Sequence, residues 1–197
     1  MDEEFEAKFY PVEKELIRKR LKEIDAQLAI PERKLRRVIF DSRCNPQIKC
    51  DVIRVRDEGG SFRISMKIHP RQGKMRDQKE VEIEVNDFDK AVRILEATGL
   101  TANRYQETLR ETWKYDGAEI DVDTWPGLKP FIEIEAESED QVKKVATKLD
   151  LDWEKRIVAS IVDVFMMVYG LSAEEVLRKI SNLTFENNSF SGLKPKV

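Results

Sequence analysis

Charged and apolar residues alternate strictly at the start of the chain, from Glu4 to Phe9. Side chains on a β-strand point alternately to its two faces, so Glu4, Glu6 and Lys8 would share one face. The apolar residues between them would share the other face. An ordinary antiparallel sheet with one wet and one dry face gives the same pattern, so this stretch alone predicts a strand and no function.

The same alternation recurs along the chain and predicts further strands. Residues 52–57 and 62–68 flank Glu58-Gly59-Gly60-Ser61, a sequence typical of a hairpin turn. Asp116-Gly117 is a second hairpin dipeptide. The other predicted strands cover residues 34–42, 80–85, 104–115, 118–123 and 131–136.

Apolar residues at helical spacing predict helices between the strands. The predicted helices cover residues 12–28, 87–98, 138–149, 153–170 and 172–180. Pro31 is expected to end the first helix, and Ser138 and Ser172 begin capping-box patterns. Residues 70–78 look like a basic loop, and residues 184–197 like a flexible tail after one domain of residues 1–183.

The fold expected from these elements is α+β, an antiparallel sheet of about eight strands with surrounding helices. Helices can cover the apolar faces of the strands. Closing the sheet into a barrel would remove its edges and turn the charged faces inward. A charged interior is costly to build unless its charges pair or bind a ligand.

Both signs of charge are supplied on the strands predicted to face inward. The basic residues are Lys8, Arg54, Arg56, Arg63, Lys67, Arg104 and Arg110. The acidic residues are Glu4, Glu6, Glu82, Glu84, Asp123, Glu133 and Glu135. Arginine clusters suit phosphate oxygens, and carboxylate clusters suit Mg²⁺ or Mn²⁺. Together they indicate a site for a metal–polyphosphate complex. Asp121 shares a face with Asp123, but we expect it to be either solvent-side or a ladder neighbour rather than a ligand.

Composition excludes several other classes of function. With 35 basic and 38 acidic residues the formal net charge is −3, so we expect no nucleic-acid partner. Cys44 and Cys50 are too few for a zinc site or a disulfide framework, and we expect a cytoplasmic protein without a signal peptide. His69, the one histidine, stands beside a proline, which argues against a serine or cysteine nucleophile. The most apolar segment, residues 157–169, is too short to span a bilayer, so we expect no membrane partner.

The order of these motifs resembles that of the CYTH superfamily, the triphosphate tunnel metalloenzymes. Glu4-x-Glu6-x-Lys8 is similar to its ExExK motif, and Ile53-Arg54-Val55-Arg56 to its paired-arginine strand. The later motifs that match in order are Ile64–Lys67, Glu82-Ile83-Glu84, Arg110, Asp123 and Phe131–Glu135. Two positions depart from the family pattern. Ser65 replaces a common threonine, and Leu128-Lys129-Pro130 replaces the usual Leu-Gly.

The resemblance implies a closed antiparallel β-barrel of about eight strands that encloses a triphosphate tunnel. It also implies a role in that tunnel for each matching residue. Phosphate binding would fall to Lys8, Arg54, Arg56, Lys67 and Arg110, with Arg63 and Arg104 as further substrate contacts. A Mg²⁺ or Mn²⁺ ion would be held by Glu4, Glu6, Asp123, Glu133 and Glu135. Glu82 and Glu84 would be acids beside the metal that assist catalysis.

The resemblance also implies metal-dependent chemistry on a small-molecule triphosphate. We expect hydrolysis of a phosphoanhydride in tripolyphosphate, thiamine triphosphate or a nucleoside triphosphate. A class IV adenylate cyclase, which makes cyclic AMP and pyrophosphate from ATP, is the alternative. A non-catalytic module that binds polyphosphate or nucleotide would use the same charges and is the second alternative. An apolar strip on the predicted helix 153–170 fits either a homodimer contact or the core.

Overall fold

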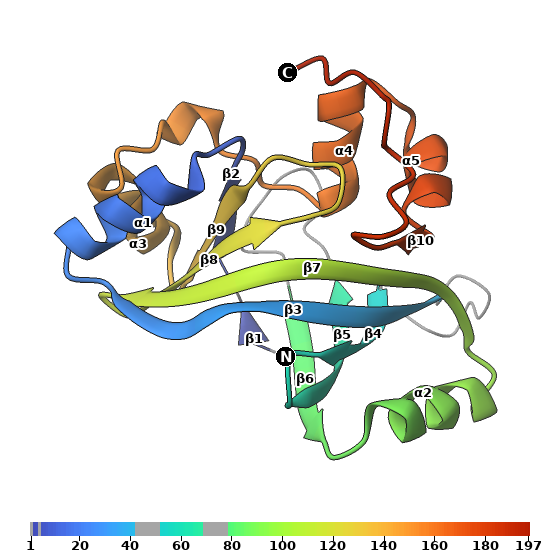
Figure 1. Ribbon diagram of the computed structural model, residues 1–197. Helices are drawn as coiled ribbons and strands as arrows, with labels where there is room; N and C mark the ends of the chain where they lie inside the picture. The colour runs from blue at the N-terminus through green and yellow to red at the C-terminus, as the bar shows by residue number, and fades with distance from the viewer. Residues whose placement is uncertain (1, 4, 42–51, 69–78) are drawn as a thin grey trace.

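The computed structural model describes residues 2–3, 5–41, 52–68 and 79–197, and within them ten strands form one sheet (Figure 1). The strands are β1 (Asp2–Glu3), β2 (Phe5–Phe9), β3 (Gln27–Asp41), β4 (Val52–Asp57), β5 (Phe62–Ile68), β6 (Lys79–Val85), β7 (Thr101–Tyr115), β8 (Ala118–Thr124), β9 (Phe131–Ala136) and β10 (Asn182–Leu183). The helices are α1 (Lys14–Glu23), α2 (Phe88–Ala97), α3 (Glu139–Lys148), α4 (Ile161–Tyr169) and α5 (Ala173–Lys179), with a short 3₁₀ helix at Trp153–Lys155.

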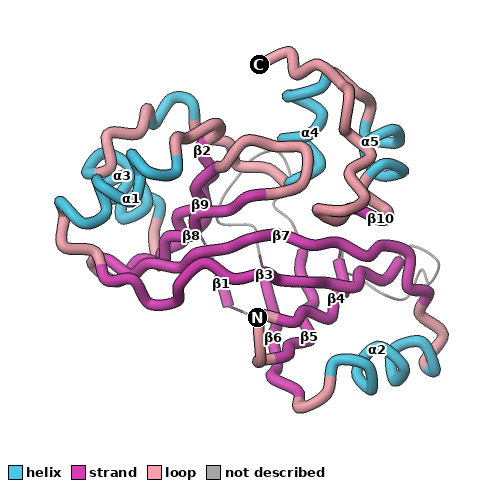
Figure 2. Tube along the Cα trace, in the orientation of Figure 1, coloured by secondary structure: helices cyan, strands magenta, loops and turns pink. Residues whose placement is uncertain are grey.

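The sheet is antiparallel and strongly curled (Figure 2). Its strand order is β1-β6-β5-β4-β3-β7-β8-β9-β2, and the small strand β10 pairs in parallel with β7. Both ends of this path belong to the N-terminal segment, because β1 pairs with β6 and β2 pairs with β9. The N-terminal segment therefore joins the two ends of the sheet. The expected antiparallel architecture of about eight strands with helices around it is confirmed.

Helices cover the outer, apolar face of the described strands in two places (Figure 1). α1 and α3 pack side by side against β2, β8 and β9, with Ile17 and Val145 among the buried residues. α2 packs on β4 and β5 on the other side of the long strands β3 and β7. α4 and α5 contact each other and bury Val164, Phe165 and Val176. Their cluster includes Phe131, which is on the same face of β9 as Glu133, so these two helices lie against the inner side of the sheet. The outer apolar faces of the strands are therefore buried under helices, and the charged faces line the interior.

The C-terminal segment packs on α4, although its sequence suggests a flexible tail. Phe190 is 2% exposed. The centre of its ring lies 4.4 Å from the ring centre of Phe165 and 4.9 Å from that of Tyr169. The backbone amide of Lys196 donates to the carbonyl of Val168. A single aromatic side chain thus brings this segment into the hydrophobic cluster around α4 and α5.

The predicted helix of residues 12–28 is wrong in its second half. α1 ends at Glu23, and β3 begins at Gln27, before Pro31 rather than after it. The pairing of β3 with β7 shifts register between Ile30 and Arg33, and a proline at such an irregularity removes no ladder hydrogen bond. The helical spacing of apolar residues up to Leu28 is coincidental in its last part, because Gln27 and Leu28 already belong to β3.

The predicted helix of residues 153–170 is also wrong in its first half. Ile157 exchanges two backbone hydrogen bonds with Lys8, of 3.0 and 2.8 Å, and this pairing requires an extended chain. α4 starts after Ser160, where Ser160 and Asp163 form a capping box. Within the described ranges, no helix combines the length and the apolar character needed to cross a membrane.

The remaining helices follow their sequence signals closely. The side chain of Asp87 accepts from the amide of Lys90 at the start of α2. Ser138 caps α3, and Ser172 with Glu175 forms a capping box on α5. These local signals are reliable because the cap hydrogen bonds lie within four residues of sequence.

Candidate functional site: a charged cavity inside the sheet

A cavity of about 350 Å³ lies on the inner face of the curled sheet. Its wall includes ten of the residues predicted as site residues: Glu6, Lys8, Arg54, Arg56, Arg63, Glu82, Arg110, Asp123, Glu133 and Glu135. They come from β2, β4, β5, β6, β7, β8 and β9. Strand alternation therefore places side chains far apart in sequence around one space, although their roles as ligands stay predictions.

The acidic wall is built from rows of residues directly opposite each other on neighbouring strands. One row runs Glu6, Glu135, Glu119 across β2, β9 and β8. The next row runs Lys8, Glu133, Asp121. Like charges directly opposite destabilise a sheet, so this wall needs cations to be stable.

Arg110 is the cation that meets most of these acids. Its Nη1 lies 2.5 Å from Asp121 Oδ2, and its Nη2 lies 2.5 Å from Asp123 Oδ2 and 2.6 Å from Glu133 Oε2. Lys8 pairs with Glu6 and, at 3.2 Å, with Glu133. Burial lowers the pKa of Arg110, but its three carboxylate neighbours more than offset this, and the pKa lies above its usual range. Arg110 is therefore charged and holds the acids together.

Asp121 and Asp123 hold their protons more tightly than exposed aspartates do. Burial raises the pKa of Asp123 to about 6, despite the opposing effect of Arg110. Burial also raises the pKa of Asp121, whose carboxylate accepts a 2.7 Å hydrogen bond from the hydroxyl of Thr112. Asp121 is thus buried and paired in the cavity wall, directly opposite Glu133. This excludes the solvent-side position and agrees with the alternative expectation of a ladder neighbour. The sequence feature that points to this inward position is that Asp121 shares a strand face with Asp123.

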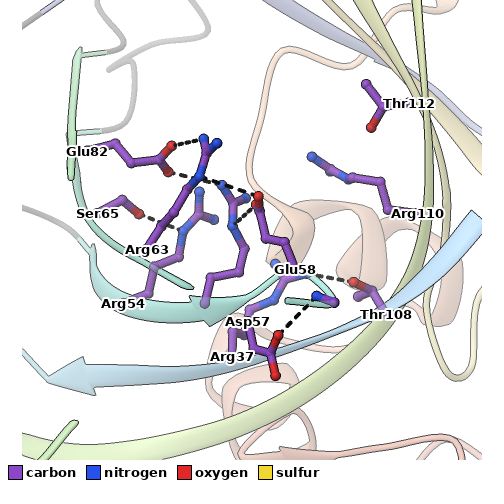
Figure 3. A network of polar contacts seen from close by, with 12 residues as sticks. Arg37, Arg54, Asp57, Glu58, Arg63, Ser65, Glu82, Thr108, Arg110 and Thr112 are labelled. Atoms are coloured by element: carbon purple, nitrogen blue, oxygen red, sulfur yellow. Dashed lines mark hydrogen bonds and ion pairs between the residues drawn. The ribbon is translucent and has the colours of Figure 1, made fainter. Parts of the chain in front are cut away.

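The basic wall lies opposite, on β4 and β5 (Figure 3). Arg54 donates to Ser65 Oγ at 2.8 Å and lies 3.3 Å from Glu80. Arg56 lies 2.6 Å from Glu58 and 3.0 Å from Glu82, and Glu82 also accepts from Arg63 at 2.5 Å. Burial, together with Arg54, lowers the pKa of Arg56 to about 10. Paired acids therefore keep a crowded set of arginines charged.

Several residues of the cavity wall were not predicted from the sequence. They are Arg33, Arg37, Glu58, Glu80, Thr112, Glu119 and Trp125. Arg33 and Arg37 lie on β3, where basic residues stand on both faces of the strand. Without clean alternation, the inward face of β3 gives no signal in the sequence.

Four predicted residues are not placed in the cavity. Glu84 is exposed and lines a separate surface depression beside the hairpin turn, and Arg104 lies further along β7, outside the cavity wall. Glu4 lies outside the described residues. Lys67 belongs to β5, but its side chain lies outside what the structure describes. The predicted loop 70–78, His69, Cys44 and Cys50 also fall outside the described ranges.

The donor chemistry of the acidic wall fits a hard divalent cation. Glu6, Glu119 and Glu135 offer only oxygen ligands in one cross-strand row, with Glu133 in the next. In the part of the chain that the structure describes, no three such side chains already surround one point that could hold a metal. Glu133 instead contacts Lys8 and Arg110. Holding a cation would therefore require these acids to turn from their present partners.

A family model described as the CYTH domain matches residues 2–159 of the chain. The chain belongs to the CYTH family. Enzymes of this family act on small-molecule triphosphates, as triphosphatases or adenylate cyclases, and depend in general on a metal ion. The matched range contains every residue of the charged cavity except Ser160 and Ile161.

Three relatives illustrate what this CYTH domain is similar to. A candidate adenylate cyclase of Methanocaldococcus jannaschii is 23% identical over 130 residues, which are 66% of this chain and 67% of the relative. The structure of a candidate adenylate cyclase from Vibrio parahaemolyticus has a TM-score of 0.70 at 15% identity, over 83% of this chain and 98% of that one. A candidate adenylyl cyclase from Hippeastrum, described as having a dominant triphosphatase activity, has a TM-score of 0.56 at 13% identity, over 90% and 95% of the two chains. At these identities the two structures establish the shared fold.

Proposed function

We propose that this CYTH domain is a divalent-metal-dependent triphosphatase that hydrolyses a phosphoanhydride of a triphosphate in the charged cavity. The observation that carries the proposal is the sorting of charge within one cavity. Arg54, Arg56 and Arg63 stand on one wall, and Asp123, Glu133 and Glu135 stand on the other. Such a pair of walls suits a polyphosphate bridged to a metal ion, because each half of that complex meets charges of the opposite sign.

The residues of the basic wall have a clear task in such a reaction. Arg54 and Arg56 would hold phosphate oxygens and neutralise the charge that spreads over the transferred phosphoryl group. Lys8 and Arg110, which contact acids in the present structure, would be shared between those acids and the phosphate. Because the strands fix all four cations, little reorganisation is needed when the substrate enters.

The acidic wall would hold the metal ion through Glu6, Glu133 and Glu135, with Asp123 beside them. A bound Mg²⁺ or Mn²⁺ lowers the pKa of water and polarises phosphoryl oxygens, which is the chemistry that hydrolysis of a phosphoanhydride needs. Asp121 and Asp123 stay anchored on Arg110 and would accept the proton released during hydrolysis at the acid side of the cavity. The setting we propose for this enzyme is the cytoplasm.

Cyclisation of ATP is the second candidate, favoured by the names of the Methanocaldococcus and Vibrio relatives. It requires the ribose 3′-hydroxyl to lie in line with the α-phosphorus, and hence a pocket that fixes the base. Charged residues make up 16 of the 23 described residues of the cavity wall, and its largest apolar side chain, Trp125, stacks with an arginine. This supports hydrolysis ahead of cyclisation, as does the activity described for the Hippeastrum relative.

The proposal is tested by phosphate release from tripolyphosphate with Mg²⁺ or Mn²⁺ and with excess EDTA. We expect release only with metal, and a loss of at least about a hundredfold in the Glu133→Gln/Glu135→Gln double variant. Glu137→Gln, an exposed glutamate just after β9, is the matched control and should keep full activity.

Full activity in EDTA, or undiminished turnover in the double variant, would contradict the metal role. The fold of the double variant is checked by its melting temperature. Neutralising two clustered carboxylates reduces their mutual repulsion, so this temperature should not fall in the metal-free protein.

A further inference from the structure

Arg37 is a buried arginine that faces the cavity, and no carboxylate of the described residues pairs with it. It is 7% exposed and lies on the inner face of β3. Its Nη2 donates a 2.8 Å hydrogen bond to Thr108 Oγ1, and its guanidinium lies 4.6 Å from the ring centre of Trp125. These two contacts fix the plane of the guanidinium, but neither neutralises its charge.

Five of the six other described cations of the cavity wall differ from Arg37 in this respect, and the sixth, Arg33, donates to the backbone carbonyl of Glu58. Lys8, Arg54, Arg56, Arg63 and Arg110 each lie within 3.3 Å of at least one carboxylate oxygen. Among the described residues, no carboxylate lies within ion-pair distance of Arg37, and its buried Nε has no hydrogen-bond partner. A buried charge without a counter-charge destabilises the folded chain. A ligand that supplies the counter-charge would explain why an arginine stands at this position.

The surroundings of Arg37 indicate the kind of ligand that would supply the counter-charge. Arg37 stands directly opposite Arg56 in the pairing of β3 with β4. Figure 3 shows it between Arg54 on one side and Arg110 on the other. Burial and these three arginines lower the pKa of Arg37. Four guanidinium groups around one space suit an anion with several charged oxygens, and the fork of each matches phosphate geometry.

We propose that Arg37 is a substrate-binding residue that receives phosphate oxygens of the triphosphate and sets the affinity of the cavity for them. The inference rests on the proposed function and extends it to a residue outside the matching sequence motifs. Because Arg37 is held by Thr108 and Trp125 and not by an acid, it binds the anion without giving up an ion pair. Arg54 and Arg56 must share their charge between the anion and their acids, so Arg37 contributes more than either.

The test is calorimetric titration of tripolyphosphate into the wild-type protein and the Arg37→Met variant, with Mg²⁺ present. Methionine keeps an unbranched apolar side chain in place of the arginine stem and removes the charged guanidinium that lies over Trp125. The matched control is Arg36→Met on the same strand. Arg36 points to the other face, where its side chain is 41% exposed, pairs with Asp57 at 2.8 Å and lies over Phe88.

We expect Arg37→Met to weaken tripolyphosphate binding about tenfold or more, as loss of a charge-assisted hydrogen bond implies. Arg36→Met should bind within about twofold of wild type. Without ligand, Arg37→Met should melt at the wild-type temperature or above, because a buried unpaired charge is gone. A purely structural arginine would instead lower that temperature.

Wild-type affinity in Arg37→Met would overturn the inference alone, whatever the melting temperature of the ligand-free variant. A wild-type protein that binds no tripolyphosphate, with Mg²⁺ or without it, would overturn the proposed function together with the inference.

Discussion

At the scale of single residues, Arg110 decides whether the acidic wall of the cavity can exist without a ligand. It contacts Asp121, Asp123 and Glu133 within 2.6 Å, and these acids lie on two neighbouring strands. Removing one partner of a buried ion pair leaves the other charges uncompensated, which costs more than the pair contributes. The protein therefore depends on this side chain for stability as well as for ligand binding.

Arg110→Met should lower the free energy of unfolding of the metal-free protein by about 3–5 kcal/mol at pH 7. The measurement is urea denaturation, with Lys114→Met, an exposed residue on the same strand, as the control that stays within about 0.5 kcal/mol. Mg²⁺ should raise the melting temperature of Arg110→Met more than that of wild type, because a cation can replace the lost charge. A loss below about 1 kcal/mol would mean that the three acids do not need Arg110.

Asp123 gives the stability of the metal-free protein a defined pH dependence. Its pKa is raised from 3.8 to about 6 by burial, so the folded chain holds this proton more tightly than the unfolded chain. The stabilising effect of the proton is complete below about pH 4 and is lost as the pH rises through about 6. Two pKa units correspond to about 3 kcal/mol.

Asparagine resembles protonated aspartate, so Asp123→Asn should remove this loss. The free energy of unfolding of Asp123→Asn minus that of wild type should therefore increase between about pH 4 and pH 6 and then level off. Urea denaturation in EDTA across this pH range measures the difference. A difference that stays flat, or that decreases with pH, would show that burial does not raise this pKa.

At the scale of elements, the sequence predicts most strands and the capped helices but misplaces two boundaries. The strands are predictable because charged and apolar residues alternate on β2, β5, β6 and β9. The first half of β3 was missed because Pro31 looked like the end of a helix, while pairing with β7 keeps the chain extended through an irregular register. Tertiary pairing of this kind overrides local preference and leaves no mark on the segment itself.

α1 is tied to the outer face of β7 by one buried acid. Glu111 accepts hydrogen bonds from Arg18 Nη2 at 2.7 Å and from the indole nitrogen of Trp113 at 2.6 Å. Glu111 is buried, whereas a quarter of the Arg18 side chain is exposed. The ion pair is thus partly screened, but the indole N–H depends on Glu111 for its hydrogen bond.

Glu111→Ala should lower the free energy of unfolding by about 2–3 kcal/mol, because the buried indole N–H loses its acceptor and Arg18 loses its buried partner but keeps its contact with Glu15. Urea denaturation measures this loss, and hydrogen exchange should show faster opening of α1. Glu23→Ala at the exposed end of α1 is the control, with a change within about 0.5 kcal/mol. Equal stability of the two variants would mean that apolar packing alone holds α1 on the sheet.

At the scale of the whole molecule, the curled sheet turns a linear pattern of charges into a cavity. Ten predicted residues reach that cavity because strand alternation fixes which face each side chain takes. Glu84 and Arg104 obey the same alternation, yet they lie outside the cavity wall. Alternation gives the face of a side chain but not its depth along the barrel, which depends on how neighbouring strands are staggered.

The partners of each charge could not be predicted from the sequence either. Arg37 shows why: its position on the inner face follows from the register with β4 and β7, and its lack of an acid follows from which residues stand opposite it. Both are properties of the assembled sheet. The chemical class of the ligand could be expected from the family motifs, whereas the contact that we propose for Arg37 could not.

Hydrolysis of a triphosphate in the charged cavity is best tested by letting two substrates compete for the enzyme in one reaction. Tripolyphosphate and ATP at equal concentration are incubated with the enzyme and Mg²⁺, then with Mn²⁺, while phosphorus NMR follows every product. We expect orthophosphate and pyrophosphate to form from tripolyphosphate and no cyclic AMP to form from ATP. Cyclic AMP and pyrophosphate from ATP, with tripolyphosphate intact, would contradict this expectation and establish the cyclase.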